Sequence, residues 1–166
     1  KQMVINSENS RDKNFIFTGR ARGGMDSQPF EPVLRALRGH FQSSKDETDE
    51  IFSDIFENLG EEKEDAATSR SPTEVLKSLL EKGFVLEETS DKDSVTYRNY
   101  VKWVLARTLV QLSLKKPIVM VISDAHEMDS ATLELFRQLH KEERHSGRLM
   151  LICELKPRDK TGAIFP

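Results

Sequence analysis

The chain has 166 residues, of which 37% are hydrophobic and 32% are charged, enough for one domain with its own core. The net charge of −3 and the lack of a basic stripe interleaved with aromatic residues argue against direct nucleic-acid binding. No apolar run approaches the roughly 18 residues of a membrane span, and no signal peptide is visible. Because a single cysteine, Cys153, also excludes an internal disulfide framework, we expect a cytoplasmic protein without membrane contact.

The first expected elements lie between residues 15 and 41. Phe15–Thr18 is a short apolar run that ends at Gly19 and predicts a buried strand. Arg20–Pro29 contains two adjacent glycines and predicts an exposed loop. From Pro32 onward a helix is predicted, because apolar residues recur at helical spacing: Val33, Leu34, Leu37 and Phe41.

An acidic segment follows, in which residues 45–65 carry ten acidic side chains against two lysines. Its apolar residues predict an amphipathic helix that ends near Gly60: Ile51, Phe52, Ile55, Phe56 and Leu59. We therefore expect residues 42–71 to form an acidic, partly flexible helical insertion. The helix is either a plain surface helix or, with its apolar stripe exposed, a docking element.

The next helix has a well-defined start signal. Ser71-Pro72-Thr73-Glu74 is a capping box with proline at the first helical position, and Gly83 is suited to end the helix. Residues 87–94 are polar and predict a solvated loop. Beyond them a long helix is predicted from one apolar face: Tyr97, Tyr100, Val101, Val104, Leu105, Thr108, Leu109 and Leu112.

Two continuous apolar runs, Ile118–Ile122 and Leu149–Cys153, predict strands buried on both faces of a parallel sheet. Between them we expect a helix that is capped by Asp129 and ends at Gly147. Its predicted core face consists of Leu133, Leu135, Phe136 and Leu139. Strand, helix and strand at this spacing make a βαβ unit with a right-handed crossover. The sequence therefore predicts an α/β fold in three layers, a mainly parallel sheet flanked by helices.

The segment Ser123–Asp129 follows a predicted buried strand and is the first candidate for a functional site. Ligands of parallel α/β sheets bind beyond the carboxyl ends of the strands. A carboxylate there, such as Asp124, can hold a magnesium ion or polarise an attacking water. Structural interpretations stay open for the same residues, with Asp124 closing a turn, His126 packed as a structural histidine and Asp129 capping the helix.

Ile118–Leu139 resembles the Walker B region of signal-transduction ATPases with numerous domains (STAND), relatives of the AAA+ branch of the P-loop NTPases. That family typically has four apolar residues, then Asp-Asp-Leu-His-Trp-Ala-Asp, then a helix rich in serine and leucine. Asp124, His126 and Asp129 match this pattern. The resemblance covers about two thirds of the chain, and residues 42–95 contribute little to it.

Flanking segments agree with the resemblance. Gly19-Arg20, followed by Pro29–Leu37, looks like the segment after the family's second strand. Lys156-Pro157 resembles the Arg-Pro that follows the family's sensor strand.

The resemblance implies roles for three residues. Asp124 falls on the catalytic acidic position, and Ser123 falls on the position of the magnesium-side aspartate, so both are expected near ATP and magnesium. Glu154 falls on the sensor position, where a carboxylate would repel a γ-phosphate. Ser123 and Glu154 depart from the family's pattern, and both departures argue against hydrolysis.

The phosphate-binding motif Gly-x-x-x-x-Gly-Lys-Ser/Thr does not occur in the sequence. In the family this loop precedes the strand that Phe15–Thr18 resembles. We therefore expect residues 1–166 to be a partial NTPase-like domain, an excised part of a longer signalling protein. Most triphosphate contacts are lost without the loop, so neither ATP nor magnesium is expected to bind this chain tightly.

Two functions follow from the resemblance. The chain belongs either to a regulatory ATPase that uses its nucleotide state as a switch, or to a degenerate pseudo-ATPase module that acts as a protein-interaction scaffold. The expected partners are other domains of the same polypeptide and signalling proteins. A third interpretation is an unrelated α/β regulatory domain that matches the Walker B pattern by chance.

Overall fold

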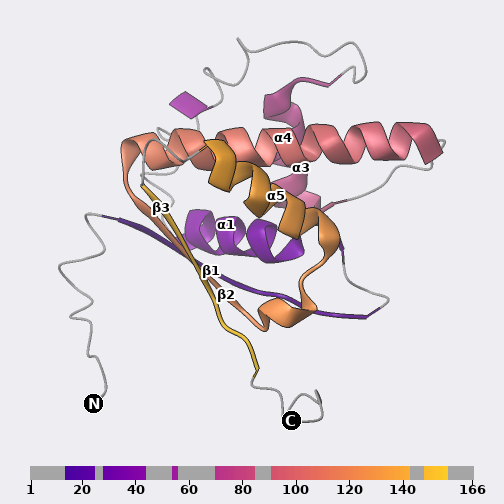
Figure 1. Ribbon diagram of the computed structural model, residues 1–166. Helices are drawn as coiled ribbons and strands as arrows, with labels where there is room; N and C mark the ends of the chain where they lie inside the picture. Colours follow the sequence, from indigo (N-terminus) through magenta and orange to yellow (C-terminus); the bar gives the residue numbers. More distant parts are fainter. Residues whose placement is uncertain are drawn as a thin grey trace, which may run out of the picture.

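The computed structural model describes residues 14–24, 28–43, 54–55, 70–84, 91–142 and 148–156. The elements in chain order are β1 (Phe15–Arg20), α1 (Glu31–Ser43), α3 (Pro72–Lys82), α4 (Asp91–Lys115), β2 (Ile118–Ser123), the short 3₁₀ helix η1 (Ala125–Glu127), α5 (Ser130–Glu142) and β3 (Leu149–Cys153) (Figure 1). Within these ranges no helix has the length and apolar character needed to cross a membrane.

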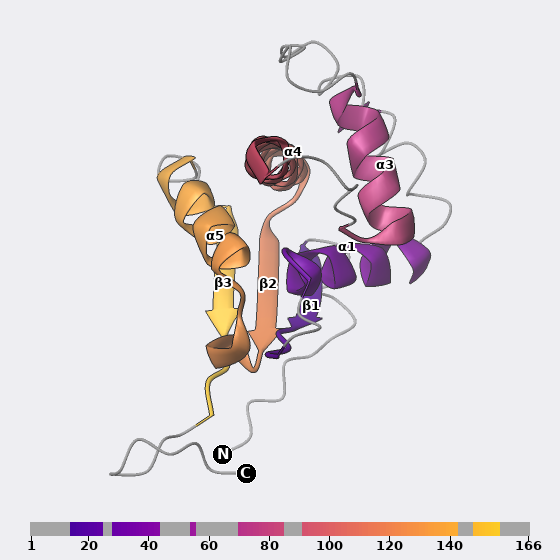
Figure 2. The ribbon, with the colours of Figure 1, turned by 90° about the vertical axis from the view of Figure 1, so that its right-hand side faces the viewer.

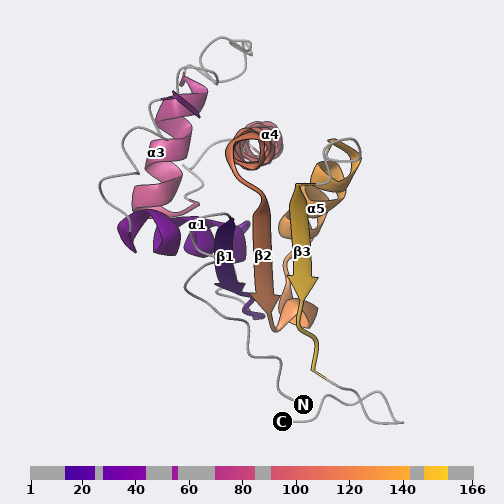
Figure 3. The ribbon, with the colours of Figure 1, turned by 90° about the vertical axis from the view of Figure 1, so that its left-hand side faces the viewer.

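A three-stranded parallel sheet, in the order β1-β2-β3, forms the centre of the structure (Figures 2 and 3). In the central strand, Ile118 pairs with Phe15 on one side and with Leu149 on the other. Parallel pairing in this register brings the carboxyl ends of all three strands to one edge of the sheet. The predicted α/β class, the parallel sheet flanked by helices and the βαβ unit are confirmed.

The helices lie on one side of the strands in Figure 1. Here α1 contacts β1 and α5, while α4 packs against α3 and α5. The sheet face toward the helices is buried, through Phe15, Phe17, Ile118, Met120 and Ile122. The sheet and one helical layer of the expected three-layer fold therefore lie within the described residues.

The opposite face of the sheet differs from the sequence-based prediction. Ile16, Met150 and Ile152 on this face are 45%, 58% and 44% exposed. The prediction of burial on both faces is therefore wrong for β3, and the short strand predicted to be buried is exposed at Ile16. Each step from β1 to β2 to β3 moves in the same direction across the sheet. Right-handed crossovers that advance in one direction place their helices on one face, which leaves the other without a crossover helix.

Two local predictions were also wrong. Residues 91–94 begin α4 instead of forming a loop. The sequence is compatible with this start, because acidic residues such as Asp91 and Asp93 are favoured in the first turn of a helix. Leu133, expected in the core, is 42% exposed. The buried positions of α5 instead include Ala131, Leu135 and Leu139, which are spaced four apart, and Leu133 lies about half a turn away from them.

Both predicted helix caps are confirmed. The Glu74 backbone N–H donates to Ser71 Oγ at 3.3 Å, and the Ser71 N–H donates to Glu74 Oε2 at 3.1 Å. Gly83 ends α3 with a φ of 84°, a conformation that glycine adopts readily. At the start of α5, the Thr132 N–H donates to Asp129 Oδ1 at 2.9 Å.

Only Asp54 and Ile55 of the acidic helix lie within the described residues, and both are helical. Ile55 is fully buried in the core of the chain, and Asp54 pairs with Lys115 of α4 at 2.6 Å. The predictions for the rest of residues 42–71, for residues 87–90 and for Gly147 lie almost wholly outside the described part of the chain. At Ile55, the predicted apolar stripe of the acidic helix is therefore buried in the core of the same chain.

Gly19 allows β1 to approach the start of α1 closely. A Cβ atom at this position would lie 2.3 Å from the backbone oxygen of Pro32 and 3.0 Å from the Ile122 side chain. A backbone atom cannot move aside as a flexible side chain can. Gly19 is therefore required by packing, in the strand that delivers Arg20 to the carboxyl edge.

We predict that Gly19→Ala lowers the free energy of unfolding by about 1–3 kcal/mol, the range for overpacking a core. The control is Gly39→Ala in α1, where an added Cβ meets nothing within 4 Å. Because alanine is the better helix former, Gly39→Ala should raise stability by about 0.5–1 kcal/mol. Urea unfolding measures both, and similar effects of the two substitutions would contradict this account of Gly19.

Candidate functional site

The segments that follow the three strands are tied together by backbone hydrogen bonds. The Ala21 N–H donates to the Ser123 oxygen at 2.9 Å, which continues the pairing of β1 with β2. The Glu154 N–H donates to the Ile122 backbone oxygen at 2.8 Å, and the Ala125 N–H donates to the Glu154 backbone oxygen at 2.9 Å. These bonds hold the backbone segments at the carboxyl edge of the sheet next to one another.

Asp124 is the central residue of this edge. It has a φ of 53° and a ψ of 37°, the left-handed conformation that residues other than glycine rarely adopt. Aspartate tolerates this conformation better than most residues, and such strain persists only where the surroundings hold it. The conformation turns the chain sharply between β2 and η1.

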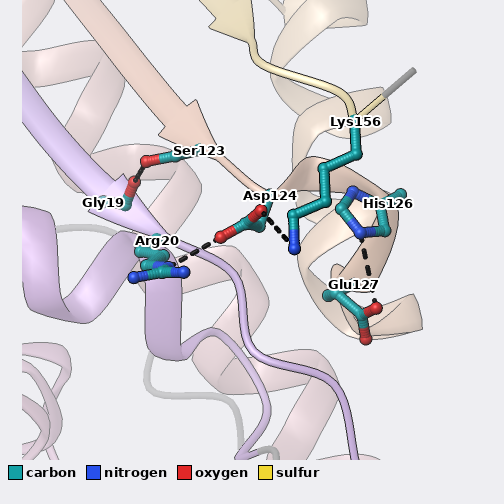
Figure 4. Close-up of polar contacts among 7 residues, drawn as sticks. All are labelled: Gly19, Arg20, Ser123, Asp124, His126, Glu127 and Lys156. Carbon is teal, nitrogen blue, oxygen red and sulfur yellow. Dashed lines mark hydrogen bonds and ion pairs between the residues drawn. The ribbon is translucent and has the colours of Figure 1, made fainter. Parts of the chain in front are cut away.

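Two cations hold the Asp124 carboxylate. Arg20 Nε, at the end of β1, donates to Oδ2 at 2.7 Å, and Lys156 Nζ, beyond β3, lies 3.7 Å from Oδ1 (Figure 4). The Asp124 side chain is only 14% exposed, whereas those of Arg20 and Lys156 are 63% and 45% exposed. One carboxylate thus connects the segments after all three strands, and we call Arg20, Asp124 and Lys156 the Asp124 clasp.

The electrostatics of the clasp keep Asp124 ionised. The hydrogen bond from Arg20 lowers the pKa of the Asp124 carboxyl, outweighing the effect of burial, and the charges of Arg20, Lys156 and His126 lower it further. A carboxylate with a lowered pKa is a weak base, poorly suited to remove a proton from water near neutral pH. Asp124 is better suited to pair with cations.

The other predicted site residues are placed differently. The Ser123 hydroxyl donates to the Gly19 backbone oxygen at 3.3 Å, so it is engaged with β1 (Figure 4). Glu154 takes part through its backbone, while its side chain is exposed. Ser123 and Asp124 lie together only because they are neighbours in the sequence. Their side chains and that of Glu154 do not form one cluster.

This arrangement does not fit a magnesium ion. The Asp124 carboxylate already carries two cationic partners, and the Ser123 hydroxyl is bonded to Gly19. Within the described ranges, no three side chains of histidine, cysteine, aspartate or glutamate converge as metal ligands. Magnesium prefers carboxylates and waters that other cations do not occupy.

The clasp borders an open cavity of about 490 Å³. The lining residues are Arg20, Ala21, Arg22, Gly23, Asp124, Glu127 and Lys156. Three cationic side chains face two carboxylates here, so the lining carries a net positive charge. Cationic side chains beyond the strands of a parallel sheet are suited to a phosphate-bearing ligand. The residues that line the cavity therefore suit an anionic ligand better than a metal ion.

Part of this cavity could be predicted from the sequence. Arg20, Arg22 and Lys156 each lie within three residues of the end of a predicted strand, which marks them as edge residues. Glu127 carried no such signal. The Glu127 carboxylate lies directly against Gly23, because a Cβ atom at Gly23 would lie 1.6 Å from Glu127 Oε2. Only the folded loop brings these two residues together.

His126 packs beside the cavity without lining it. Its side chain is 9% exposed, and its Nε2 lies 3.4 Å from Glu127 Oε1. Its Nδ1 is buried without a hydrogen-bond partner in the described structure. This burial agrees with the structural interpretation of His126.

We predict that Asp124→Asn lowers stability at pH 7 and that its difference from the wild type disappears in acid. The lowered pKa means that the clasp stabilises the fold fully above pH 3.8, the ordinary pKa of the group. The stabilisation is lost as the pH falls through the folded-state value. Thermal unfolding at pH 7 and at pH 2–3 measures this difference.

The control for that experiment is Glu134→Gln, which removes the pair between Lys102 and Glu134, whose carboxylate side chain is 56% exposed against 14% for Asp124. Exposed pairs contribute little to stability, so this variant should follow the wild type at each pH. A destabilisation by Asp124→Asn of the same size at both pH values would show that the charge of Asp124 is irrelevant.

Comparison of the chain with protein-family models, with curated proteins and with solved structures finds no match. The relation to STAND ATPases is therefore a prediction that rests on the motifs of the sequence.

Proposed function

We propose that this chain is part of a nucleotide-dependent regulatory switch in a cytoplasmic signalling ATPase. The observation that carries the proposal is the Asp124 clasp beside a cationic cavity, at the edge where parallel α/β sheets bind ligands. In this proposal the cavity receives phosphate groups of the nucleotide, and Asp124 reports their presence.

The switch would work by exchange of anions. A phosphate group carries the charge and the hydrogen-bond acceptors that Arg20 and Lys156 now receive from Asp124. When phosphate replaces the carboxylate, both cations keep a counter-charge, and Asp124 is released from the segments that follow β1 and β3. A ligand shifts a conformational equilibrium only through different interactions with the two states, and this exchange supplies the difference.

The geometry favours sensing over hydrolysis. Asp124 matches the catalytic position of the resemblance, yet its carboxylate is a weak base held by two cations. The Ser123 hydroxyl donates a hydrogen bond to the Gly19 backbone oxygen, and Glu154 is not among the described residues that line the cavity. We therefore assign Asp124 a positioning role, and we expect turnover, if the complete polypeptide has it, to depend on residues elsewhere.

A protein-interaction scaffold is the second candidate function. The observation that favours it is the exposed apolar face of the sheet, formed in part by Ile16, Met150 and Ile152. Such a surface needs no nucleotide. The two candidates differ in one measurable property, because only the switch requires that the cationic cavity bind phosphate.

The test is calorimetric titration of the chain with ATP and with inorganic triphosphate, each with and without magnesium. We expect dissociation constants of about a millimolar or weaker for the wild type, because no phosphate loop is present in the sequence. Lys156→Gln should weaken binding further. Asp124→Asn should strengthen it, since this substitution removes the competing carboxylate.

The matched control is again Glu134→Gln, which changes the net charge as Asp124→Asn does but lies outside the cavity. It should leave the dissociation constants unchanged. Binding that Asp124→Asn leaves equal or makes weaker would contradict anion exchange. A complete absence of binding in all variants would contradict the phosphate site and support the scaffold.

A further inference from the structure

The cavity beside the clasp is lined by a second carboxylate, Glu127, which the proposed switch does not use. Two cations hold the Asp124 carboxylate, whereas Glu127 contacts no lysine or arginine within the described part of the chain. Its Oε1 lies 3.4 Å from Nε2 of the buried His126, and Figure 4 shows this pair apart from the clasp. Glu127 therefore has room for a partner that the clasp does not supply.

The position of Glu127 is fixed from two sides. Its backbone N–H donates to the Asp124 backbone oxygen at 2.9 Å, at the end of η1. Its carboxylate lies against Gly23 in the segment after β1, where a Cβ atom would come within 1.6 Å of Oε2. The carboxylate thus occupies the space that a side chain at residue 23 would fill. Glu127 is a built part of the cavity wall.

The chemistry of Glu127 selects for a hydrogen-bond donor. An ionised carboxylate only accepts hydrogen bonds, and its two oxygens offer about four acceptor sites. The Glu127 side chain is 42% exposed, so these sites are open to a ligand. It repels phosphate groups, and a ligand ammonium would lie beside the three cationic side chains of the same lining. Neutral hydroxyl groups meet neither repulsion.

The rest of the lining favours the sugar of a nucleotide over its base. Among the described residues that line the cavity, only Ala21 has an apolar side chain, and none is aromatic. Pockets that hold aromatic rings are lined mainly by hydrophobic and aromatic side chains. The two neighbouring hydroxyls of a ribose can both donate to one carboxylate. An acidic side chain binds ribose in this way in other parallel α/β folds.

We infer that Glu127 determines specificity for ribonucleoside phosphates, by accepting hydrogen bonds from the ribose hydroxyls while the phosphate groups lie on Arg20 and Lys156. The cavity then reads the sugar and the phosphates of its ligand and is indifferent to the base. This inference rests on the proposed function, because it assumes that the cavity binds phosphate. It adds a requirement for hydroxyl groups that the anion exchange at Asp124 does not contain.

The experiment titrates the full chain with ATP, GTP, 2′,3′-dideoxy-ATP and inorganic triphosphate, without magnesium and at matched ionic strength. Amide NMR signals report the binding, since this method measures dissociation constants of millimolar and weaker. We expect ATP and GTP to bind the wild type alike. 2′,3′-Dideoxy-ATP should bind about tenfold more weakly, the effect of losing about one hydrogen bond to a charged group.

Two variants assign the difference to Glu127. Glu127→Ala should bind ATP and 2′,3′-dideoxy-ATP alike, and it should bind inorganic triphosphate more tightly than the wild type, because a repelling charge is removed. Gly23→Ala keeps the net charge but displaces the carboxylate, so it should also lose the tenfold difference. The matched control is Gly39→Ala in α1, where the added Cβ meets nothing within 4 Å and the difference should remain.

Three results would overturn the inference and leave the switch intact, provided that inorganic triphosphate binds. The first is equal binding of ATP and 2′,3′-dideoxy-ATP by the wild type. The second is a difference between them that survives in Glu127→Ala, and the third is a clear preference for one base over the other. Failure of every probe, including inorganic triphosphate, to bind any variant would instead overturn the phosphate site and the sugar specificity together.

Discussion

The parallel register of β2 with both neighbouring strands is the constraint on which the rest of the structure depends. It brings Arg20 opposite Ser123 and places Cys153 beside Ile122, so the segments that carry Asp124 and Lys156 leave the sheet at one edge. The same register also separates the two faces, because alternate residues of a strand point in opposite directions. The clasp and the exposed apolar face of Ile16, Met150 and Ile152 are therefore consequences of one set of backbone hydrogen bonds.

The clasp combines a local strain with long-range charge pairing. An exposed arginine–carboxylate pair taken alone contributes little to stability. Here a single, largely buried carboxylate is shared by Arg20 and Lys156 and lies on a residue with left-handed backbone conformation. The conformation persists because its surroundings hold it. In the proposed switch, an anion that replaced the carboxylate would remove part of those surroundings. This is the physical reason to regard the edge as a sensor.

Local signals in the sequence predicted local structure well. Ser71 and Glu74 define the start of α3 through their own side chains, and Asp129 caps α5 in the same way. Burial was harder to predict, because an apolar run does not reveal which element covers it. Ile16 and Leu133 are both apolar and both substantially exposed, since no other described part of the chain packs over them as fully as over their buried neighbours.

The position of Asp124 at a ligand-binding edge was predictable, but its partners were not. Arg20 lies 104 residues before Asp124, and only the strand register brings the two together. The direction of the Ser123 hydroxyl toward Gly19 depends on the same pairing. Sequence reasoning therefore located the carboxylate, and the family resemblance implied a catalytic role for it beside the simpler one of closing a turn. The folded arrangement adds the two cations that contact it, Arg20 and Lys156.

The most direct test of the central claim is a double-mutant cycle between Arg20→Gln and Asp124→Asn, measured by unfolding with and without saturating inorganic triphosphate at matched ionic strength. Without triphosphate, the account predicts that the double variant loses less stability than the sum of the two single variants. With triphosphate, the losses should become additive, because phosphate has taken the place of the Asp124 carboxylate. Additive losses in both conditions, or a coupling that triphosphate leaves unchanged, would contradict the account.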